Sequence, residues 1–286
     1  MNIAISGASG FIGRHLMKSL AAAGHAPRAL SRHAPPAESL RAADVVIHLA
    51  GEPIAQRWTA QAKRRIGESR VAGTRHLVEA LAGLPRRPEA LICASAIGYY
   101  GSRGDEILTE SSAPGSGFLP ELCVAWESEA QAAEALGMRV VRMRTGLVLD
   151  ARGGALQRML PPFRMALGGR LGSGRQWMSW IHLEDLARLF QFAVENPVRG
   201  PLNGVAPDPV INSDFTRELA RALRRPALFP VPEFALRLLF GEMADVLLSS
   251  QRVAPRAAQA AGFRFRFPQL APALASLLVQ SRIISK

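Results

Sequence analysis

Three glycines near the start of the chain have the spacing of a loop that holds phosphates. Gly7, Gly10 and Gly13 follow the short apolar segment 2–6 and precede the helical segment 14–23. Between a strand and a helix, the first glycine allows a tight turn, the second lets backbone approach a pyrophosphate, and the third permits close helix–strand packing. Free N–H groups at the start of the helix also attract phosphate. The pattern predicts a bound dinucleotide.

The residues after the next strand-like segment, 26–30, indicate which dinucleotide is bound. An NAD site needs an acidic residue roughly 20 residues after the loop, but no acidic residue precedes Glu38. Ser31 and Arg32 stand at that place instead. Arginine can grip a 2′-phosphate, and the serine can add a hydrogen bond. We therefore expect NADP(H) as the cofactor.

The elements that must position these residues alternate along the first 150 residues. Segments typical of buried strands occupy residues 2–6, 26–30, 44–49, 90–93 and 139–144. Helical segments occupy residues 14–23, 61–82 and 119–136. This alternation predicts an α/β fold with a Rossmann-like, doubly wound parallel sheet. Only about a dozen residues separate Arg32 from the strand at 44–49, so we expect the usual third strand to be short or missing.

Beyond Asp150 the pattern changes to loops rich in glycine and proline, followed by mostly helical segments. We expect an NADP-binding Rossmann domain at 1–150, to which 178–205 return. A smaller, mostly helical substrate or lid domain would comprise 151–177 and 206–286, with a small-molecule substrate in the cleft between the two. Ser213 is a plausible N-cap for a helix with Phe215 and Leu219 on one face.

Composition excludes several classes of partner. The net charge is +12, but the arginines are scattered, with no run longer than two and no basic stripe interleaved with aromatics. We therefore expect no nucleic-acid partner. No segment has the roughly 20 apolar residues of a membrane span, and the six histidines lack metal-ligand spacing. Two cysteines cannot form a disulfide framework, which favours a cytoplasmic protein.

Several motifs resemble the extended, epimerase-like branch of the short-chain dehydrogenase/reductase superfamily. They are the SGASGFIG loop at 6–13, HLAG at 48–51, VAGT at 71–74, ASA at 94–96 and WIHLED at 180–185. A closer resemblance is to a subgroup of atypical NADP-binding epimerase-like proteins of largely unassigned activity. Its marks are LAGEPI at 49–54, GYYG at 98–101, and MLPPFRMALGGRLGSGRQ at 159–176. Segments 241–253 and 261–268 resemble that subgroup's added C-terminal domain.

The resemblance implies a cofactor site that runs from the glycine loop to the ends of later strands. Its residues would be Gly7, Ser9, Gly10, Phe11, Ile12, Ser31, Arg32, Leu49, Ala50, Gly51, Arg70, Ser95, Leu147 and Val148. Ser95, Leu147 and Val148 would lie near the nicotinamide. Arg70 replaces the family's usual asparagine and would either contact ribose or phosphate or form a surface salt bridge.

The superfamily's catalytic tyrosine and lysine, four residues apart, are missing. The chain has two tyrosines, Tyr99 and Tyr100, and neither is followed by lysine at that spacing. In the superfamily the tyrosine exchanges a proton with the substrate. The ordinary machinery for hydride transfer is therefore absent.

Three residues are the candidate replacements, and each also has a structural interpretation. Ser95 could polarise a carbonyl, Tyr99 could act as an acid, and Glu127 as a base. Glu52 is a weaker acid/base candidate. Arg175, in the glycine-rich loop 172–176, could grip an anionic group, or the loop could be a flexible edge of the lid.

Two functional hypotheses follow. The first is an NADP(H)-binding, epimerase-like oxidoreductase with an atypical active site and an unknown substrate. The second is a non-catalytic NADPH-binding redox sensor or interaction protein, related to cell division as suggested for relatives in the subgroup. An enzyme should change NADPH absorbance with a small carbonyl or sugar-nucleotide substrate. A sensor should show cofactor-dependent partner binding and no turnover.

Replacing Arg32 tests the choice of cofactor. The Arg32→Ala variant should bind NADPH about tenfold more weakly or worse, because a hydrogen bond to a charged group contributes about 1.5–3 kcal/mol. Its affinity for NADH should stay the same. Titration of both proteins with both nucleotides measures the effect. A wild-type protein that binds NADH as tightly as NADPH, or a variant that keeps the preference, would contradict the assignment.

Overall fold

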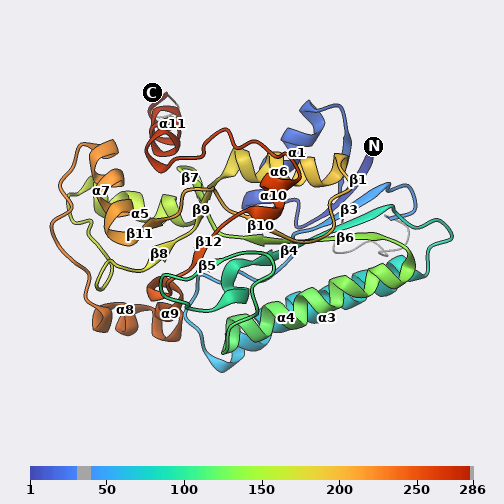
Figure 1. Ribbon diagram of the computed structural model, residues 1–286, viewed down its shortest axis with the longest axis horizontal. Coiled ribbons are helices and arrows are strands. Elements are labelled where there is room, and N and C mark those ends of the chain that lie inside the picture. The colour runs from blue at the N-terminus through green and yellow to red at the C-terminus, as the bar shows by residue number, and fades with distance from the viewer. Residues whose placement is uncertain (31–39, 284–286) are drawn as a thin grey trace.

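A six-stranded parallel sheet lies at the centre of the computed structural model, which describes residues 1–30 and 40–283. The strand order is β10-β6-β4-β3-β1-β2 (Figure 1). The strands are β1 (Asn2–Ser6), β2 (Ala26–Ala29), β3 (Val45–His48), β4 (Ala90–Ala96), β6 (Arg139–Thr145) and β10 (Gly200–Gly204). The predicted α/β fold with a Rossmann-like sheet is confirmed.

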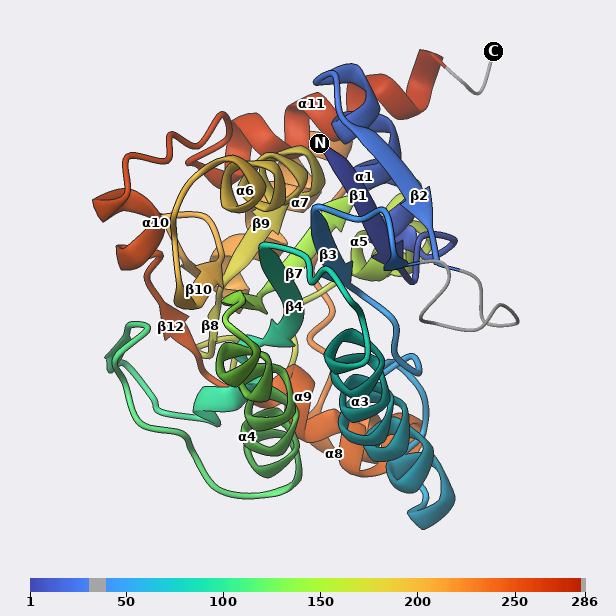
Figure 2. The same ribbon diagram turned by 90° about the vertical axis from the view of Figure 1, so that its right-hand side faces the viewer.

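Helices cover both faces of the sheet because its side chains alternate between them. In β1, Ile3 and Ile5 pack towards α1 (Phe11–Ala22) and α6 (Leu183–Glu195). Ala4, between them, belongs to the opposite core with α3 (Ala60–Ala82) and α4 (Phe118–Gln131). Helices α3 and α4 pack side by side on that face (Figure 2). The near-continuous apolar strands are thus buried from two sides.

Strand register sets which residues meet at the carboxyl edge of the sheet. The parallel pairing of β4 with β6 places Ser95 beside Arg144. The pairing of β1 with β3 places Ser6 beside His48. Strand β4 runs to Ala96, beyond the predicted end at 93, and so carries Ser95 itself. Ligands of open α/β sheets bind outside this edge.

Within the described residues, β2 is the edge strand next to β1. Ser31 and Arg32, on which the predicted cofactor preference depends, follow β2 and lie in segment 31–39, outside the described residues. The structure therefore leaves this part of the predicted site as a prediction.

The later part of the chain adds a second, mostly helical core. Strands β7 (Leu147–Asp150) and β9 (Trp180–His182) pair in parallel. Against them pack α5 (Gly154–Arg164), α7 (Asn212–Leu223) and α11 (Leu270–Ile283) (Figure 1). The division into two domains remains a prediction.

Shorter elements complete the chain. The two-stranded pairs are β8 (Trp177–Met178) with β11 (Val210–Ile211), and β5 (Ile107–Leu108) with β12 (Arg252–Val253). The short helices are α8 (Glu233–Phe240), α9 (Ala244–Leu248) and α10 (Arg256–Ala260). The 3₁₀ turns are η1 (Ile97–Tyr100), η2 (Ala132–Leu136) and η3 (Gly241–Met243). In the described ranges, no helix combines the length and the apolar character that crossing a membrane requires.

The predicted N-cap at Ser213 is wrong. Helix α7 begins at Asn212, and Ser213 already lies in its first turn. The side-chain oxygen of Asn212 accepts the backbone N–H of Leu171 at 2.7 Å, and its own N–H donates to the Gln176 carbonyl at 2.9 Å. These tertiary contacts set the helix start, so the local capping preference of serine does not decide it.

A buried carboxylate attaches the C-terminal segment to the Rossmann sheet. Asp185, in the first turn of α6, is 0% exposed. Its oxygens accept the backbone N–H groups of Arg266 and Phe267 at 2.8 Å each, and the guanidinium of Arg188 at 2.9 Å. Residues 263–267, in which phenylalanine and arginine alternate, are thereby held along α6.

Removing the Asp185 carboxylate should destabilise the protein strongly. The Asp185→Ala variant removes the acceptor of two partly buried backbone N–H groups, each at a cost of about 1–3 kcal/mol. We expect its free energy of unfolding to fall by about 3 kcal/mol in urea denaturation. The control Asp245→Ala breaks the exposed pair with Arg237 at 2.9 Å and should cost about 0–1 kcal/mol. Equal losses in the two variants would contradict the buried role.

Candidate functional site

Three glycines shape a cradle at the carboxyl end of β1. Gly7 has a φ of +74°, and a Cβ there would lie 2.8 Å from the backbone nitrogen of Ala50. A Cβ at Gly13 would lie 2.2 Å from the Gly7 carbonyl oxygen. Gly10 is the N-cap of α1 and provides no side-chain cap for the helix's first N–H groups. Those N–H groups can therefore hold an anion, and the loop fits a dinucleotide pyrophosphate.

The next residues of the predicted cofactor site attach this loop to its surroundings. The ring of Phe11 occupies the space that side chains at Gly153 and Gly154 would take, at the start of α5. Ile12 packs against the core on the α1 face. Ser9 is exposed, and its carbonyl accepts a hydrogen bond from Arg14 at 2.8 Å.

A buried histidine lies at the end of β3, directly before the predicted cofactor residues Leu49–Gly51. Nδ1 of His48 lies 2.5 Å from the Ser6 hydroxyl, and its Nε2 has no hydrogen-bond partner within the described chain. Burial lowers the pKa of His48 to about 4. The ring is therefore neutral at pH 7, and it contacts the residue before the glycine loop without adding charge.

Arg70, on α3, faces the loop after β3. Its Nη1 donates to the Glu52 carbonyl at 2.9 Å, and its Cζ would lie 3.1 Å from a Cβ at Gly51. Its guanidinium also lies over the ring of Trp126, 5.1 Å from the centroid. Burial lowers the pKa of Arg70. The structure thus places Arg70 against predicted cofactor residues, where its guanidinium donates to the carbonyl oxygens of Glu52 and Ile66.

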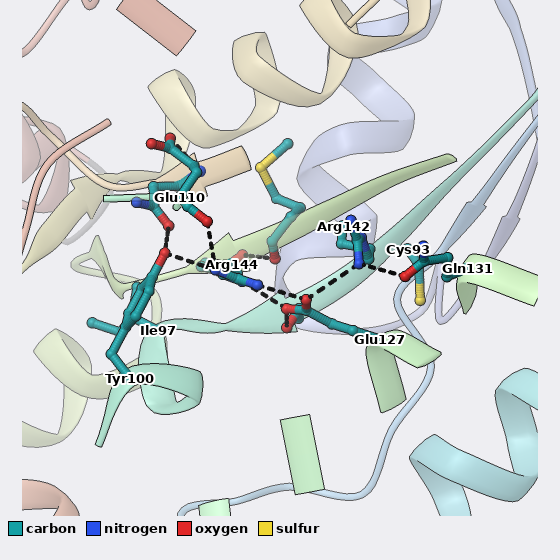
Figure 3. Close-up of polar contacts among 12 residues, drawn as sticks. Cys93, Ile97, Tyr100, Glu110, Glu127, Gln131, Arg142 and Arg144 are labelled. Atoms are coloured by element: carbon teal, nitrogen blue, oxygen red, sulfur yellow. Dashed lines mark hydrogen bonds and ion pairs between the residues drawn. The ribbon is translucent and has the colours of Figure 1, made fainter. Parts of the chain in front are cut away.

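A buried ion pair lies at the carboxyl ends of β4 and β6 (Figure 3). Arg144 donates from Nε and Nη2 to the two carboxylate oxygens of Glu127, at 2.8 Å each. The Ser95 hydroxyl donates to Glu127 Oε1 at 2.6 Å. All three side chains are at most 4% exposed. Two of the predicted catalytic residues therefore contact each other directly.

Both tyrosines contact the same arginine. The Tyr100 hydroxyl accepts from Arg144 Nη1 at 3.0 Å and donates to Asn203 Oδ1 at 2.7 Å (Figure 3). Burial raises the pKa of Tyr100 to about 12. The guanidinium lies 3.5 Å from the ring centroid of Tyr99. Burial by itself would lower the pKa of Arg144, but its hydrogen bonds and attraction to Glu127 raise it overall.

The structure brings Ser95, Tyr99 and Glu127 together as one cluster around Arg144. Sequence reasoning missed Arg144 itself, its partner Tyr100, and Asn203, which accepts a hydrogen bond from Tyr100. A usable signal was present, because Arg144 lies in a strand that also carries the buried apolar residues Val140, Val141 and Met143. A charged residue in such a strand requires a buried partner.

The remaining residues considered lie outside this cluster, or their side chains already have a partner or a place in the core. Leu147 and Val148 form the start of β7, beside β9. Glu52 lies 3.6 Å from Arg65, and Arg175 is exposed. Burial raises the pKa of the Cys123 thiol to about 12, which suits a core residue better than a nucleophile. Across residues 1–30 and 40–283, no His, Cys, Asp and Glu side chains form a group suited to holding a metal ion.

Comparison with known proteins gives consistent matches. Residues 3–206 match the NAD dependent epimerase/dehydratase family, and residues 231–277 match a domain of unknown function, DUF1731. The epimerase family protein YfhF of Bacillus subtilis is 39% identical, over 99% of this chain and all of the relative. An epimerase family protein of Arabidopsis thaliana, the chloroplastic SDR39U1 homolog, is 38% identical, over 97% and 87% of the two chains.

A solved structure is also similar. The human epimerase family protein SDR39U1, crystallised with NADPH, superposes with a TM-score of 0.90 at 35% identity. The match covers 97% of this chain and 99% of the human one. It includes both the sheet and the C-terminal helical region.

Breaking the buried ion pair should destabilise the fold. The Glu127→Ala variant leaves Arg144 buried and unpaired, which costs about 3–5 kcal/mol. Urea denaturation should show this loss, and the double variant Glu127→Leu with Arg144→Met should be more stable than Glu127→Ala. On the same helix, Glu129 pairs with exposed Arg75 at 2.5 Å, so Glu129→Ala serves as the control and should cost about 0–1 kcal/mol. Similar losses in Glu127→Ala and the control would contradict this account.

Proposed function

The chain belongs to the NAD dependent epimerase/dehydratase family, and from this we propose that it binds NADP(H) and uses it to oxidise or reduce a small molecule. The observation that carries the proposal is the glycine cradle, in which side chains at Gly7 and Gly13 would collide with backbone. A relative that is 35% identical over nearly the whole chain was crystallised with NADPH, which supports the choice of cofactor.

The cofactor would follow the carboxyl edge of the sheet. The N–H groups at the start of α1 would hold the pyrophosphate, and Ser31 and Arg32 the 2′-phosphate. Segment Leu49–Gly51 and Arg70 would contact the middle of the molecule. Ser95, with Leu147 and Val148, would face the nicotinamide. When bound, the cofactor supplies the hydride donor or acceptor that the chain's own side chains lack.

Ser95 is the residue we place against the reacting oxygen of the substrate. Its hydroxyl hydrogen points to Glu127 at 2.6 Å, so the lone pairs of Oγ are available to a substrate hydroxyl. A proton from that hydroxyl could move to Ser95 Oγ while Ser95 passes its own proton to Glu127 Oε1. Glu127 and Arg144 then act through Ser95 as positioning residues, and this relay would stand in for the missing tyrosine and lysine.

One observation favours the alternative of a non-catalytic NADPH-binding sensor or interaction protein. Hydrogen bonds link Glu127 to Arg144, Arg144 to Tyr100 and Tyr100 to Asn203 in one buried network. A network satisfied in this way rigidifies a site without needing to transfer protons.

Under both proposals the protein acts in the cytoplasm, with its substrate or signal bound between the sheet and the helical C-terminal region. Two free, buried cysteines are compatible with that compartment.

Absorbance of NADPH distinguishes the two functions. The purified protein should consume NADPH with some member of a panel of small carbonyls and nucleotide sugars. The Ser95→Ala variant should then lose about 100-fold or more in turnover, the usual effect of removing a proton-transfer group, with NADPH binding retained. Ser128→Ala, an exposed change on α4, is the control and should keep full activity.

The other outcomes have separate meanings. Full turnover in Ser95→Ala would exclude the proposed relay while leaving the enzyme proposal intact. No turnover across the panel, with NADPH-dependent association with a protein partner, would support the sensor.

A further inference from the structure

A cationic cavity lies against helix α7. Figure 1 shows where this helix lies in the fold. Its volume is about 260 Å³, and it is bounded by α7, the loop before β8 and the segment after α7. The polar lining residues are Arg170, Ser213, Thr216, Arg217 and Arg225. None of them belongs to the predicted cofactor or catalytic residues. We propose that this cavity binds a phosphoryl group, either as free phosphate or as part of a small organic phosphate.

The charges around the cavity do not cancel. Of its three arginines, Arg217 pairs with Asp214 at 2.8 Å. Arg170 donates to the uncharged carbonyl of Ser173 at 2.6 Å and so keeps its charge uncompensated. The Arg225 backbone N–H donates to the Ala220 carbonyl at 3.0 Å, but its guanidinium makes no hydrogen bond or ion pair within the described chain. Two guanidinium groups are therefore available to an anion, and their planar forks match phosphate oxygens.

Two hydroxyl groups face the same space. No residue of the described chain hydrogen bonds to the side-chain hydroxyls of Ser213 and Thr216, although Thr216 is largely buried. Gly174 lets two of the lining residues lie close to its backbone, since a Cβ there would lie 3.1 Å from Arg170 Cδ and 3.3 Å from Ser213 Cβ. Hydroxyls of this kind donate readily to phosphate oxygens. Cations and donors thus converge from separate segments of the chain.

The remaining lining residues limit the kind of ligand. They are apolar, and consist of Ala220 on α7 and Pro226, Ala227, Leu228 and Pro230 after it. The volume is below the range of about 300–1,000 Å³ usual for drug-sized ligands. A phosphoryl group with at most a short apolar substituent fits these limits. Sequence reasoning placed an anion contact in this loop at Arg175, whereas the structure places Arg170 of the preceding stretch at the cavity.

Calorimetric titration of the full chain, without nucleotide, tests the proposal. Inorganic phosphate is the first probe and phenyl phosphate the second, both at constant ionic strength set with chloride. We expect saturable binding of phosphate, and a loss of about tenfold or more in the Arg225→Ala variant, as for one charged hydrogen bond. Arg221→Ala removes an exposed arginine of α7 that pairs with Glu218 at 2.7 Å, outside the cavity lining, and should bind like the wild type.

The two probes distinguish the sources of the phosphoryl group. Equal affinities would indicate a site for free phosphate, and tighter binding of phenyl phosphate that is lost in Leu228→Ser would indicate an organic phosphate. Either outcome supports the proposal that the cavity binds a phosphoryl group. Absence of saturable binding with both probes, or equal weakening in Arg225→Ala and Arg221→Ala, would overturn it. NADPH binding should be unchanged in all three variants, so this test is independent of the proposed cofactor site.

Discussion

Burial of the positive charge of Arg144 is the constraint on which the carboxyl edge of the sheet depends. A charge removed from water costs several kcal/mol unless it is paired and hydrogen bonded. Strand β6 lies between β4 and β10, so the partners must come from elements around it. Glu127 comes from α4 and Tyr100 from η1, and Tyr100 in turn donates to Asn203 of β10. The guanidinium thereby holds α4 and η1 directly and is linked to β10 through Tyr100.

The same pairing decides which groups remain for chemistry. Glu127 has both oxygens engaged by Arg144, and Tyr100 has its hydroxyl engaged on both sides. Among the described residues, the Ser95 hydroxyl oxygen accepts no hydrogen bond and the Tyr99 hydroxyl makes none, so these two groups remain for a ligand. The chain therefore offers two different kinds of site for an anion. Backbone N–H groups at α1 can hold an anion without charged side chains, whereas the cavity beside α7 relies on arginines.

Much of the fold, and about half of the candidate site, could be predicted from the sequence. The glycine loop and the buried strands depend on local spacing and on apolar runs, which a single sequence displays directly. The contact between Ser95 and Glu127 depends on where α4 lies against β4 and β6, which local spacing does not specify. The predicted start of α7 was wrong for the same reason, because Asn212 is held by a hydrogen bond from Leu171, 41 positions earlier. Arg32 remains a prediction because it lies outside the described residues.

The position of β10 has a consequence for the newly made chain. This strand completes the sheet beside β6, yet residues 146–199 separate the two in sequence. Until residue 204 has been synthesised and released, one side of β6 exposes unpaired backbone groups, a surface that favours aggregation. At synthesis rates of about 5–20 residues per second, that interval lasts on the order of several seconds. Arg142 and Arg144 lie in this temporarily open strand, and their charges oppose pairing with another chain until Asn203 arrives.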